Sequence, residues 1–335
     1  MDQNLTRQNP PISVIIPAYN TGQYIGRTLD SLANQTFNNF EIIVIDDNST
    51  DDTVAVVKEH QLNDPRIILI NNNQNLGPCI SRNRGMEIAR GKYVAILDSD
   101  DLSEPSRLAI QFKYLEENPK VTLIGSQGIR IDENDRLIGD INLSTDPSII
   151  KYRLITENNL IHSSVFFRKN EIMSIGGYDK KYQGIEDFDL YSRLLKKNFI
   201  ILNLPQRLVF YRQRKGSILS SSDSRQLALK NVYTLIYGNI QEYVPMNEKV
   251  FARYYHAYLL KEFGAIPFAD FWLSLSINRR ILRVFFSREK LTESQKTSII
   301  AIYRQNRKWN IKRYLVGKYR MLKIIFKLGQ LNTSK

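Results

Sequence analysis

The sequence predicts an α/β fold in which a mostly parallel sheet carries helices on both faces. Short apolar runs rich in β-branched residues recur in the N-terminal third, and each is followed by a helical stretch. The runs are apolar throughout rather than alternating, which indicates strands buried on both faces. Ligands of such sheets bind outside the carboxyl ends of the strands, so the residues that follow each run are the first candidates for a site.

The elements alternate regularly up to about residue 120 and less regularly afterwards. The predicted strands of the first part are 13–19, 41–46, 66–70 and 93–97, and helices follow through 25–32, to about 60 and over 79–90. The second part predicts strands at 121–131, 160–168 and 200–204 and helices at 188–196, 226–240, 248–262 and 310–327. We therefore predict an α/β domain over 1–224, the first candidate to carry an active site, and a helical, basic region over 225–335.

Composition excludes several classes of protein. A chain of 335 residues with 42% hydrophobic and 24% charged residues is neither disordered, collagenous nor a coiled coil. Its net charge of +13 arises in 278–335, where 16 Lys and Arg face only Glu289 and Glu293. Cys79 is the only cysteine, and neither a signal pattern nor a long apolar run is seen. We expect a cytoplasmic protein that is either free in the cytosol or attached to the inner face of the cell membrane without crossing it.

Acidic residues follow two of the predicted strands. Asp46 and Asp47 end one, and Asp98, Asp100 and Asp101 follow another. Asp is common in turns and caps, but clustered carboxylates repel one another unless a cation or donor network compensates. Because Mg²⁺ and Mn²⁺ are shared between carboxylates and phosphates, the cluster suggests a metal-bound diphosphate. The chain has neither G-x-G-x-x-G nor a P-loop, which disfavours a dehydrogenase or kinase.

A series of short motifs stands in a fixed order over about residues 12–222. They are Ser13-Val-Ile-Ile-Pro-Ala-Tyr-Asn20, Ser31-Leu-Ala-Asn-Gln-Thr36, Glu41-Ile-Ile-Val-Ile-Asp-Asp-Asn-Ser-Thr-Asp51, Asn75-Leu-Gly77, Ser81-Arg-Asn83, Ala95-Ile-Leu-Asp-Ser-Asp-Asp101, His162-Ser-Ser-Val-Phe-Phe-Arg168, Gly176-Gly-Tyr-Asp179, Glu186-Asp-Phe-Asp-Leu190 and Tyr211-Arg212 with Ser217. This ordered set resembles the family 2 glycosyltransferases. The layout, with its basic C-terminal extension, is similar to bacterial enzymes that build lipopolysaccharide or capsular glycans.

The resemblance implies a GT-A fold, a nucleotide-sugar donor, a Mn²⁺ or Mg²⁺ ion and inversion at the anomeric carbon. It places Pro17 and Tyr19 against the nucleobase, with the Tyr19 ring stacked on it. It also implies that Asp47 accepts from a ring N–H, which suits uracil, with Asp46 nearby. Asp98 would face the ribose or a metal-bound water, and Asp100 would ligate the metal. The segment with Arg82 and Arg84 would border the nucleotide, although either could be a solvated helix charge.

The same resemblance implies that Asp187 is the catalytic base of an inverting, hexosyltransferase-type enzyme. A base must come within about 3 Å of the acceptor hydroxyl whose proton it takes. The hydroxyl would belong to a glycan or a lipid-linked saccharide. Glu186 is expected near this acceptor, whereas Asp189 is expected to be structural because the three acids cannot all point the same way on a helix.

One position departs from the family pattern. Many relatives have His two residues after the Tyr-Arg pair, where this chain has Arg214. Arginine does not ligate cations but pairs with phosphate oxygens, so we expect Arg214 to bind the diphosphate. The alternative is a solvent-facing loop arginine. His162 is expected near the diphosphate too, with a hydrogen-bonded structural histidine as the alternative.

The C-terminal tail predicts a basic amphipathic helix, and three alternative functions remain to be weighed. Apolar and basic residues interleave at helical spacing over 310–327, which is typical of a helix on an anionic membrane, or of one packed on its own domain. Nucleic-acid binding is disfavoured because no recognition motif accompanies the charge. A sugar-1-phosphate nucleotidyltransferase would need a basic, Gly-rich first loop, but no basic residue precedes Arg27 after the first strand. A non-catalytic nucleotide-sugar-binding protein would not need its acids intact.

Overall fold

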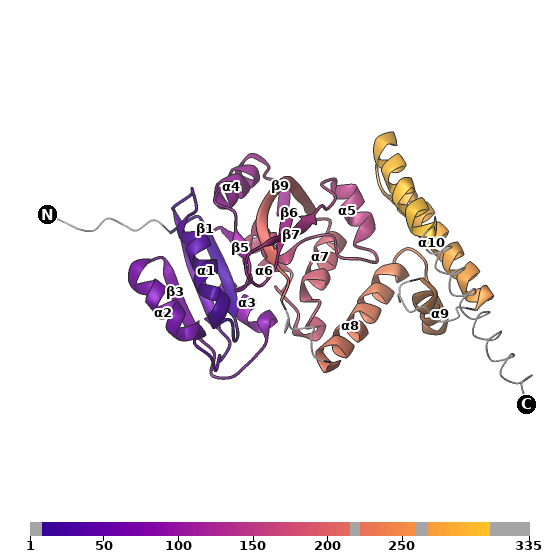
Figure 1. Cartoon of the computed structure of the whole chain (residues 1–335). Helices are drawn as coiled ribbons and strands as arrows, with labels where there is room; N and C mark the ends of the chain where they lie inside the picture. Colours follow the sequence, from indigo (N-terminus) through magenta and orange to yellow (C-terminus); the bar gives the residue numbers. More distant parts are fainter. Residues whose placement is uncertain (1–8, 215–221, 259–266, 309–335) are drawn as a thin grey trace, which may run out of the picture. The chain divides into compact units, whose positions relative to one another are not determined.

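The computed structural model describes residues 9–214, 222–258 and 267–308 (Figure 1). The chain divides into two compact units, Met1–Val232 and Tyr233–Lys335. The described strands all belong to the first unit, and they form one nine-stranded sheet. The described part of the second unit is helical. The boundary lies eight residues beyond the predicted position and falls inside a helix, α8 (Ser222–Gln241).

The first half of the sheet is parallel. Its strands are β1 (Ile12–Ala18), β2 (Phe40–Asp46), β3 (Ile67–Asn71) and β4 (Tyr93–Ile96), in the order β3-β2-β1-β4. Every residue of β1, β2 and β4 is buried, as continuous apolar runs predict. The register pairs Ala18 with Asp46 and Asp46 with Asn71, so the carboxyl ends of three strands meet at one edge.

The second half of the sheet is mixed. Next to β4 come β8 (Phe166–Arg168), β6 (Val121–Ile131), β9 (Ile200–Arg212) and β5 (Leu102–Ser103), while β7 (Leu137–Ile141) pairs with β6. The strand expected at 160–168 was wrong in its first part, because His162–Ser164 forms a 3-10 turn. The Ser164 hydroxyl donates to the Ile161 carbonyl and closes this turn. The strand expected to end at Leu204 continues to Arg212.

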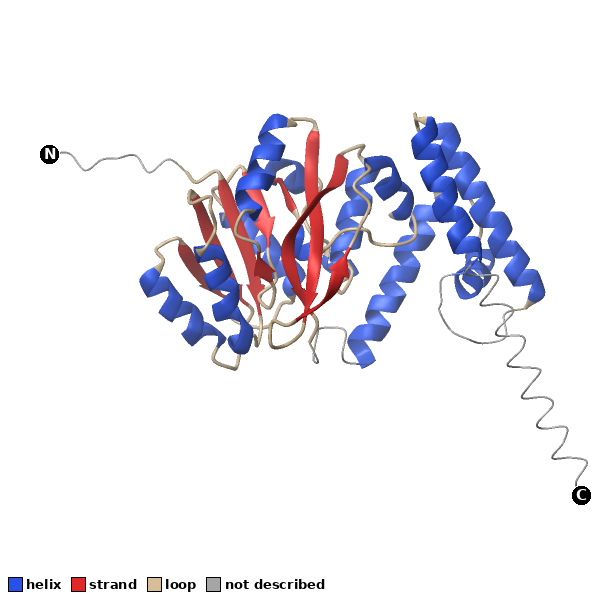
Figure 2. Cartoon of the chain, turned by 45° about the horizontal axis from the view of Figure 1, so that its top comes forward, coloured by secondary structure: helices blue, strands red, loops and turns tan. Residues whose placement is uncertain are grey.

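Helices cover both faces of the sheet (Figure 2). In the first unit they are α1 (Gly22–Ala33), α2 (Thr53–Asn63), α3 (Pro78–Ile88), α4 (Arg107–Glu117), α5 (Pro147–Arg153), α6 (Lys169–Ser174) and α7 (Glu186–Lys196), with a 3-10 turn at Lys180–Tyr182. Helix α1 buries one apolar stripe that includes Ile25, Leu29 and Leu32. Helix α3 begins with Pro78 directly after Gly77, whose φ of 85° favours glycine.

The second unit contains part of α8, then α9 (Glu248–Tyr258), α10 (Phe268–Arg288) and a helical stretch at 293–308. The ring of Phe251 packs against Tyr233 and Tyr255 in its core. Phe271 and Phe285 of α10 are buried as well, so these rings serve packing. The helix expected at 310–327 lies outside the described residues. None of the helices in the described ranges is long and apolar enough to cross a membrane.

Candidate functional site

The loops after β1 and β2 are fastened to each other at the carboxyl edge of the sheet. The Asp47 amide donates to the Ala18 carbonyl at 2.8 Å, and the Asn72 amide donates to the Asp46 carbonyl at 2.8 Å. Asn20 stands in the left-handed region and its Oδ1 accepts from the Thr50 amide at 2.8 Å. These contacts hold the ends of β1, β2 and β3 and the loops after them together at one edge of the sheet.

The predicted nucleobase residues divide into a buried and an exposed set. Pro17, Asp46 and Asp47 are buried, whereas the Tyr19 side chain is 46% exposed beyond the end of β1. The Asp47 carboxylate accepts from the amides of Leu76 at 2.9 Å and Gly77 at 2.7 Å and from Asn72 Nδ2 at 2.6 Å. It therefore holds the loop before α3, and a base N–H would share an oxygen that already has protein partners. Asp46 Oδ1 is buried and has no hydrogen-bond partner among the described residues.

The two arginines of α3 take different places. Arg84, one of the two arginines predicted to border the nucleotide, donates to the Asn71 carbonyl at 3.0 Å and to Asn72 Oδ1. Arg82 is buried, and its Nη2 donates to Asp98 Oδ1 at 2.8 Å while its Nη1 donates to Glu186 Oε1 at 2.7 Å. Arg82 is thus the arginine that enters the acidic site, a role that its motif, Ser81-Arg-Asn83, did not reveal.

The carboxylates after β4 lie close enough to perturb one another. Burial alone would raise the pKa of Asp98, but Arg82 and then His162 hold it below its usual value. Burial and then the charge of Asp98 raise the pKa of Asp100, against the opposing effect of Arg214. Burial and the charges of Asp100 and Asp98 raise the pKa of Asp101 well above its usual value. Burial and mutual repulsion therefore both act on these carboxylates, and Arg82 and Arg214 oppose them at Asp98 and Asp100.

Arg212 at the end of β9 and Arg214 just beyond it bind the carboxylates that follow β4. The Arg212 amide donates to Asp101 Oδ1 at 2.7 Å, and its Nε donates to the Asp100 carbonyl at 2.6 Å. Arg214 Nε pairs with Asp100 Oδ2 at 2.5 Å. The guanidinium that the sequence assigned to the diphosphate thus lies against the predicted metal ligand.

The donor set fits a hard divalent cation that a substrate helps to hold. Asp98 and Asp100 supply carboxylate oxygens, and their mutual repulsion is what a cation would relieve. In the described ranges no group of three or more His, Cys, Asp or Glu could hold a metal ion. Asp98 and Asp100 would hold a Mn²⁺ or Mg²⁺ ion only together with ligands from outside these residues, such as the phosphates of a substrate.

Helix α7 brings the predicted base to the same region. Asp187 stands in its first turn, partly exposed, and its Oδ2 accepts from Asn158 Nδ2 at 2.7 Å while its Oδ1 accepts from the Phe188 amide at 2.7 Å. Burial and then the charge of Glu186 raise the pKa of Asp187 to about 6. Glu186 accepts from Arg82 and, at 2.7 Å, from the Gly184 amide, so both of its oxygens already bind protein. Asp189 pairs with Arg193 at 2.8 Å on the same helix.

His162 lies between two tyrosines. Its Nδ1 is 2.9 Å from the Tyr191 hydroxyl and its Nε2 is 3.3 Å from the Tyr178 hydroxyl. Burial and then Arg82 lower the pKa of His162 to about 3, so the ring is neutral at pH 7. With both ring nitrogens in contact, the structural role weighed for His162 is favoured. Tyr211, for which the sequence assigned no role, is 39% exposed on β9.

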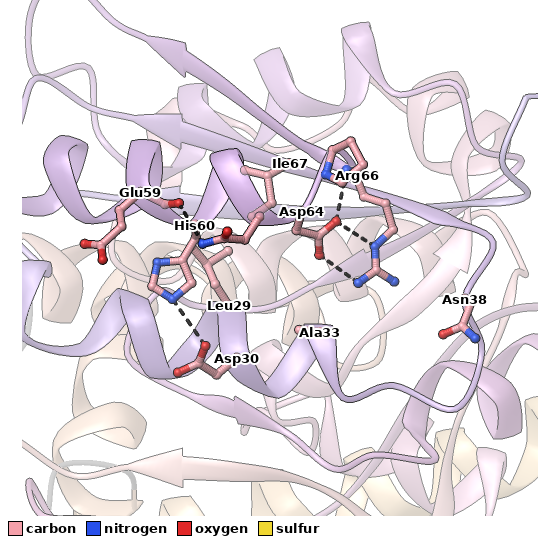
Figure 3. A pocket seen from close by; sticks show the side chains of 11 residues that line it. Leu29, Asp30, Ala33, Asn38, Glu59, His60, Asp64, Arg66 and Ile67 are labelled. Carbon is pink, nitrogen blue, oxygen red and sulfur yellow. Dashed lines mark hydrogen bonds and ion pairs between the residues drawn. The ribbon is translucent and has the colours of Figure 1, made fainter.

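A cavity of about 630 Å³ lies elsewhere in the first unit, between the C-terminal parts of α1 and α2 (Figure 3). It is lined by residues that precede or begin strands, such as Asn38 and Arg66, rather than by residues that follow them. Two side-chain pairs lie within it, His60 with Asp30 and Arg66 with Asp64. The acids that follow β2 and β4 do not line it, so it is separate from the candidate site.

A mixed α/β sheet with acids at its carboxyl edge and a further aspartate on α7 is the arrangement expected of a glycosyltransferase of the GT-A fold. The sequence model described as Glycosyl transferase family 2 matches residues 13–175. An uncharacterized glycosyltransferase of Methanocaldococcus jannaschii is 35% identical over 61% of this chain and 71% of that protein. The UDP-Glc:alpha-D-GlcNAc-diphosphoundecaprenol beta-1,3-glucosyltransferase WfaP of Escherichia coli is 31% identical over 66% and 84%. The chain belongs to glycosyltransferase family 2.

Solved structures confirm the fold. Residues 1–349 of S. aureus TarS, in complex with UDP-GlcNAc, give a TM-score of 0.58 at 19% identity and cover 92% of this chain and 91% of that one. The mannosyltransferase PcManGT of Pyrobaculum calidifontis, in complex with GDP-Man and Mn²⁺, gives 0.56 at 18% identity, with coverage of 92% and 86%. At these identities the likeness concerns the fold alone.

Proposed function

We propose that this enzyme transfers a sugar, with inversion, from a UDP-sugar to a hydroxyl of a glycan or a lipid-linked saccharide. Asp187 is the general base, and Asp98 and Asp100 would hold a Mn²⁺ or Mg²⁺ ion that neutralises charge on the donor diphosphate. The observation that carries the proposal is the contrast between Asp187 and the acids after β4. Asp187 has a pKa of about 6 and one neutral side-chain donor, Asn158, whereas Asp98 and Asp100 are paired with arginines.

This contrast supports Asp187 as the base and the acids after β4 as the metal ligands. A base must be ionised near neutral pH and still have appreciable proton affinity, which a pKa of about 6 supplies. Asp187 takes the proton of the acceptor hydroxyl as its oxygen attacks the anomeric carbon from the face opposite the leaving nucleotide. One displacement inverts the centre without a covalent intermediate. Glu186 is less suited to this task because Arg82 and the Gly184 amide occupy its oxygens.

The donor side is supplied by the loops after β1, β2 and β4. The exposed ring of Tyr19 offers a stacking surface for a nucleobase. Asp47 fixes the loop before α3 through the Gly77 amide. A divalent cation would offset the negative charge that grows on the departing diphosphate. Arg214 offers its planar donors to the phosphates when it leaves Asp100.

For the acceptor and location we propose a lipid-linked saccharide at an anionic membrane face. The E. coli relative WfaP is named for a diphosphoundecaprenol-linked acceptor. One face of α10 carries Trp272, 52% exposed, and the exposed residues Arg279, Arg280 and Arg283, with no acid between them. Such a face suits anionic headgroups. A truncation at residue 277, which the charge distribution suggests as a test, would cut α10 and confound folding with binding.

Donor binding and turnover test the activity. Nucleotide-sugars are screened with Mn²⁺ for thermal stabilisation and for slow hydrolysis without acceptor, because a ligand of the folded state raises stability. We expect UDP-sugars to stabilise the protein and to be hydrolysed to UDP. Asp187→Asn should abolish hydrolysis but keep stabilisation, and normal turnover in this variant would reject the base. Formation of UDP-sugar from UTP and a sugar 1-phosphate would instead favour a nucleotidyltransferase.

Vesicle binding tests the location. Replacement of Arg279, Arg280 and Arg283 by Ser should abolish co-sedimentation with vesicles that contain phosphatidylglycerol. A control that replaces the exposed Lys58, Lys113 and Lys120 removes the same charge from the first unit and should retain binding. Equal binding by both triple variants would contradict a role for the α10 face.

A further inference from the structure

Arg82 forms ion pairs with two carboxylates, one on the donor side of the proposed site and one beside the proposed base. Asp98 follows β4 on the donor side, and Glu186 begins α7 next to the base. The two terminal nitrogens of one guanidinium reach them at 2.8 and 2.7 Å. Arg82 comes from α3, so three elements distant in sequence meet at this side chain.

The stability of the fold does not by itself explain this arrangement. The Arg82 side chain is 6% exposed, and its Nε is buried without a hydrogen-bond partner. Buried ion pairs of this kind are often no more stabilising than apolar side chains of similar volume, because desolvation offsets the attraction. In Arg82 both Nη atoms have carboxylate partners and Nε has none. This geometry suits a side chain that holds Asp98 and Glu186 at a fixed distance from each other.

The start of α7 depends on Glu186. The residue before the helix is Ile185, which provides no side-chain cap for the first amides. Glu186, the first residue of α7, is held by groups outside the helix, because it accepts from the Gly184 amide through Oε2 and from Arg82 through Oε1. Because Asp187 is the next residue, any shift of Glu186 moves the base.

We infer that Arg82 is a positioning residue that links Asp98 to Glu186 and so transmits occupation of the donor side to the Asp187 base. This inference rests on the proposed function. A cation that fixes the Asp98 carboxylate would also fix Arg82, whose Nη2 pairs with that carboxylate, and Arg82 would in turn hold Glu186 through Nη1. Occupation of the donor side therefore orders the first turn of α7, and the base is set in place when a donor is present.

Hydrogen exchange measured by mass spectrometry tests this link without an identified sugar. The probes are UDP and Mn²⁺, and the peptides of interest cover 98–101 and 184–190. In the wild type we expect both peptides to exchange more slowly when the probes bind. In Arg82→Lys, one ammonium can pair with only one carboxylate at a time, so the response should persist at 98–101 and disappear at 184–190. The isosteric Glu186→Gln should give the same separation.

Arg66→Lys is the matched control. Arg66 also forms a two-armed pair, with Asp64 at 2.8 and 2.7 Å, but near the start of β3. This variant should keep the response at both peptides. A response at 184–190 that survives in Arg82→Lys or Glu186→Gln, or is missing in a wild type protected at 98–101, would overturn the inference.

The outcomes separate this inference from the proposed function. If the probes protect no peptide in the wild type, the proposed uridine and cation site fails. The link is then judged on ligand-free proteins, where loss of a charged hydrogen bond should speed exchange at 184–190 by on the order of tenfold in Arg82→Lys. Equal basal exchange in the wild type and this variant would reject the positioning role. Folding of each variant is checked by its thermal midpoint.

Discussion

The acidic limb of the pH–activity profile is the most direct test of Asp187. With a pKa of about 6, the carboxylate is about one tenth ionised at pH 5 and about nine tenths ionised at pH 7. The kcat/KM for donor hydrolysis should therefore rise roughly tenfold over this interval. A base with an unperturbed carboxyl pKa near 3.9 would change by only about a tenth over the same interval.

Replacing Glu186 tests the direction in which its charge shifts the pKa of Asp187. Its charge is the second cause, after burial, of the raised pKa of Asp187. In Glu186→Gln a like charge is lost, so the pKa of Asp187 should fall and the acidic limb should move to lower pH. Burial remains, so the limb should stay above that of an ordinary aspartate. At pH 5 the variant should retain a larger fraction of its own maximal activity than the wild type does.

The assay follows UDP release from a UDP-sugar at constant ionic strength and saturating Mn²⁺. Because the acids after β4 also titrate, UDP and Mn²⁺ affinity is measured at each pH and the profile is read only where affinity is constant. A flat profile from pH 5 to 7, or a limb that moves to higher pH in Glu186→Gln, would refute this account of the base.

Three further predictions concern single side chains. Arg214→Ala should weaken UDP binding by about tenfold, since one charged hydrogen bond is lost; unchanged affinity with and without Mn²⁺ would reject the phosphate contact. Tyr19→Ala should cost roughly tenfold in UDP affinity and Tyr19→Phe little, because stacking needs only a ring; equal calorimetric constants would contradict this. Cys79 is 2% exposed, and burial and then Glu186 raise its pKa to about 12; iodoacetamide at pH 8 should label it only after unfolding, and rapid labelling of the folded protein would argue against this burial.

The parallel half of the sheet could be predicted from the sequence because each of its central strands is a continuous apolar run. The strand residues Ile15, Ile43 and Ala95 stand in runs that are buried on both faces. The mixed half was harder to predict. β5 has two residues and β7 is mostly exposed, so neither presents an apolar run. Their pairing is fixed by β9 and β6, which no local pattern reveals.

The candidate site shows the same limit. Motif order placed Asp98, Asp100 and Asp187 on loops and a helix start, and the structure has them there. The partners of these acids could not be inferred, because Arg82 reaches Glu186 across 104 positions and Arg214 reaches Asp100 across 114. A one-dimensional pattern identifies residue types, whereas charge compensation depends on which side chains tertiary folding brings together.

The raised pKa of Asp187 also implies a conflict between stability and activity. A carboxyl with a raised folded-state pKa contributes stability while it is protonated, and that contribution is lost as pH rises from about 4 through about 6. At pH 7 the ionised group therefore destabilises the fold by up to about 3 kcal/mol. Asp187→Asn, which resembles the protonated form, should unfold at a higher temperature than the wild type at pH 7 and at a similar one at pH 4. A lower midpoint for the variant at pH 7 would show that the contacts with Asn158 and the Phe188 amide outweigh the cost of burying the charge.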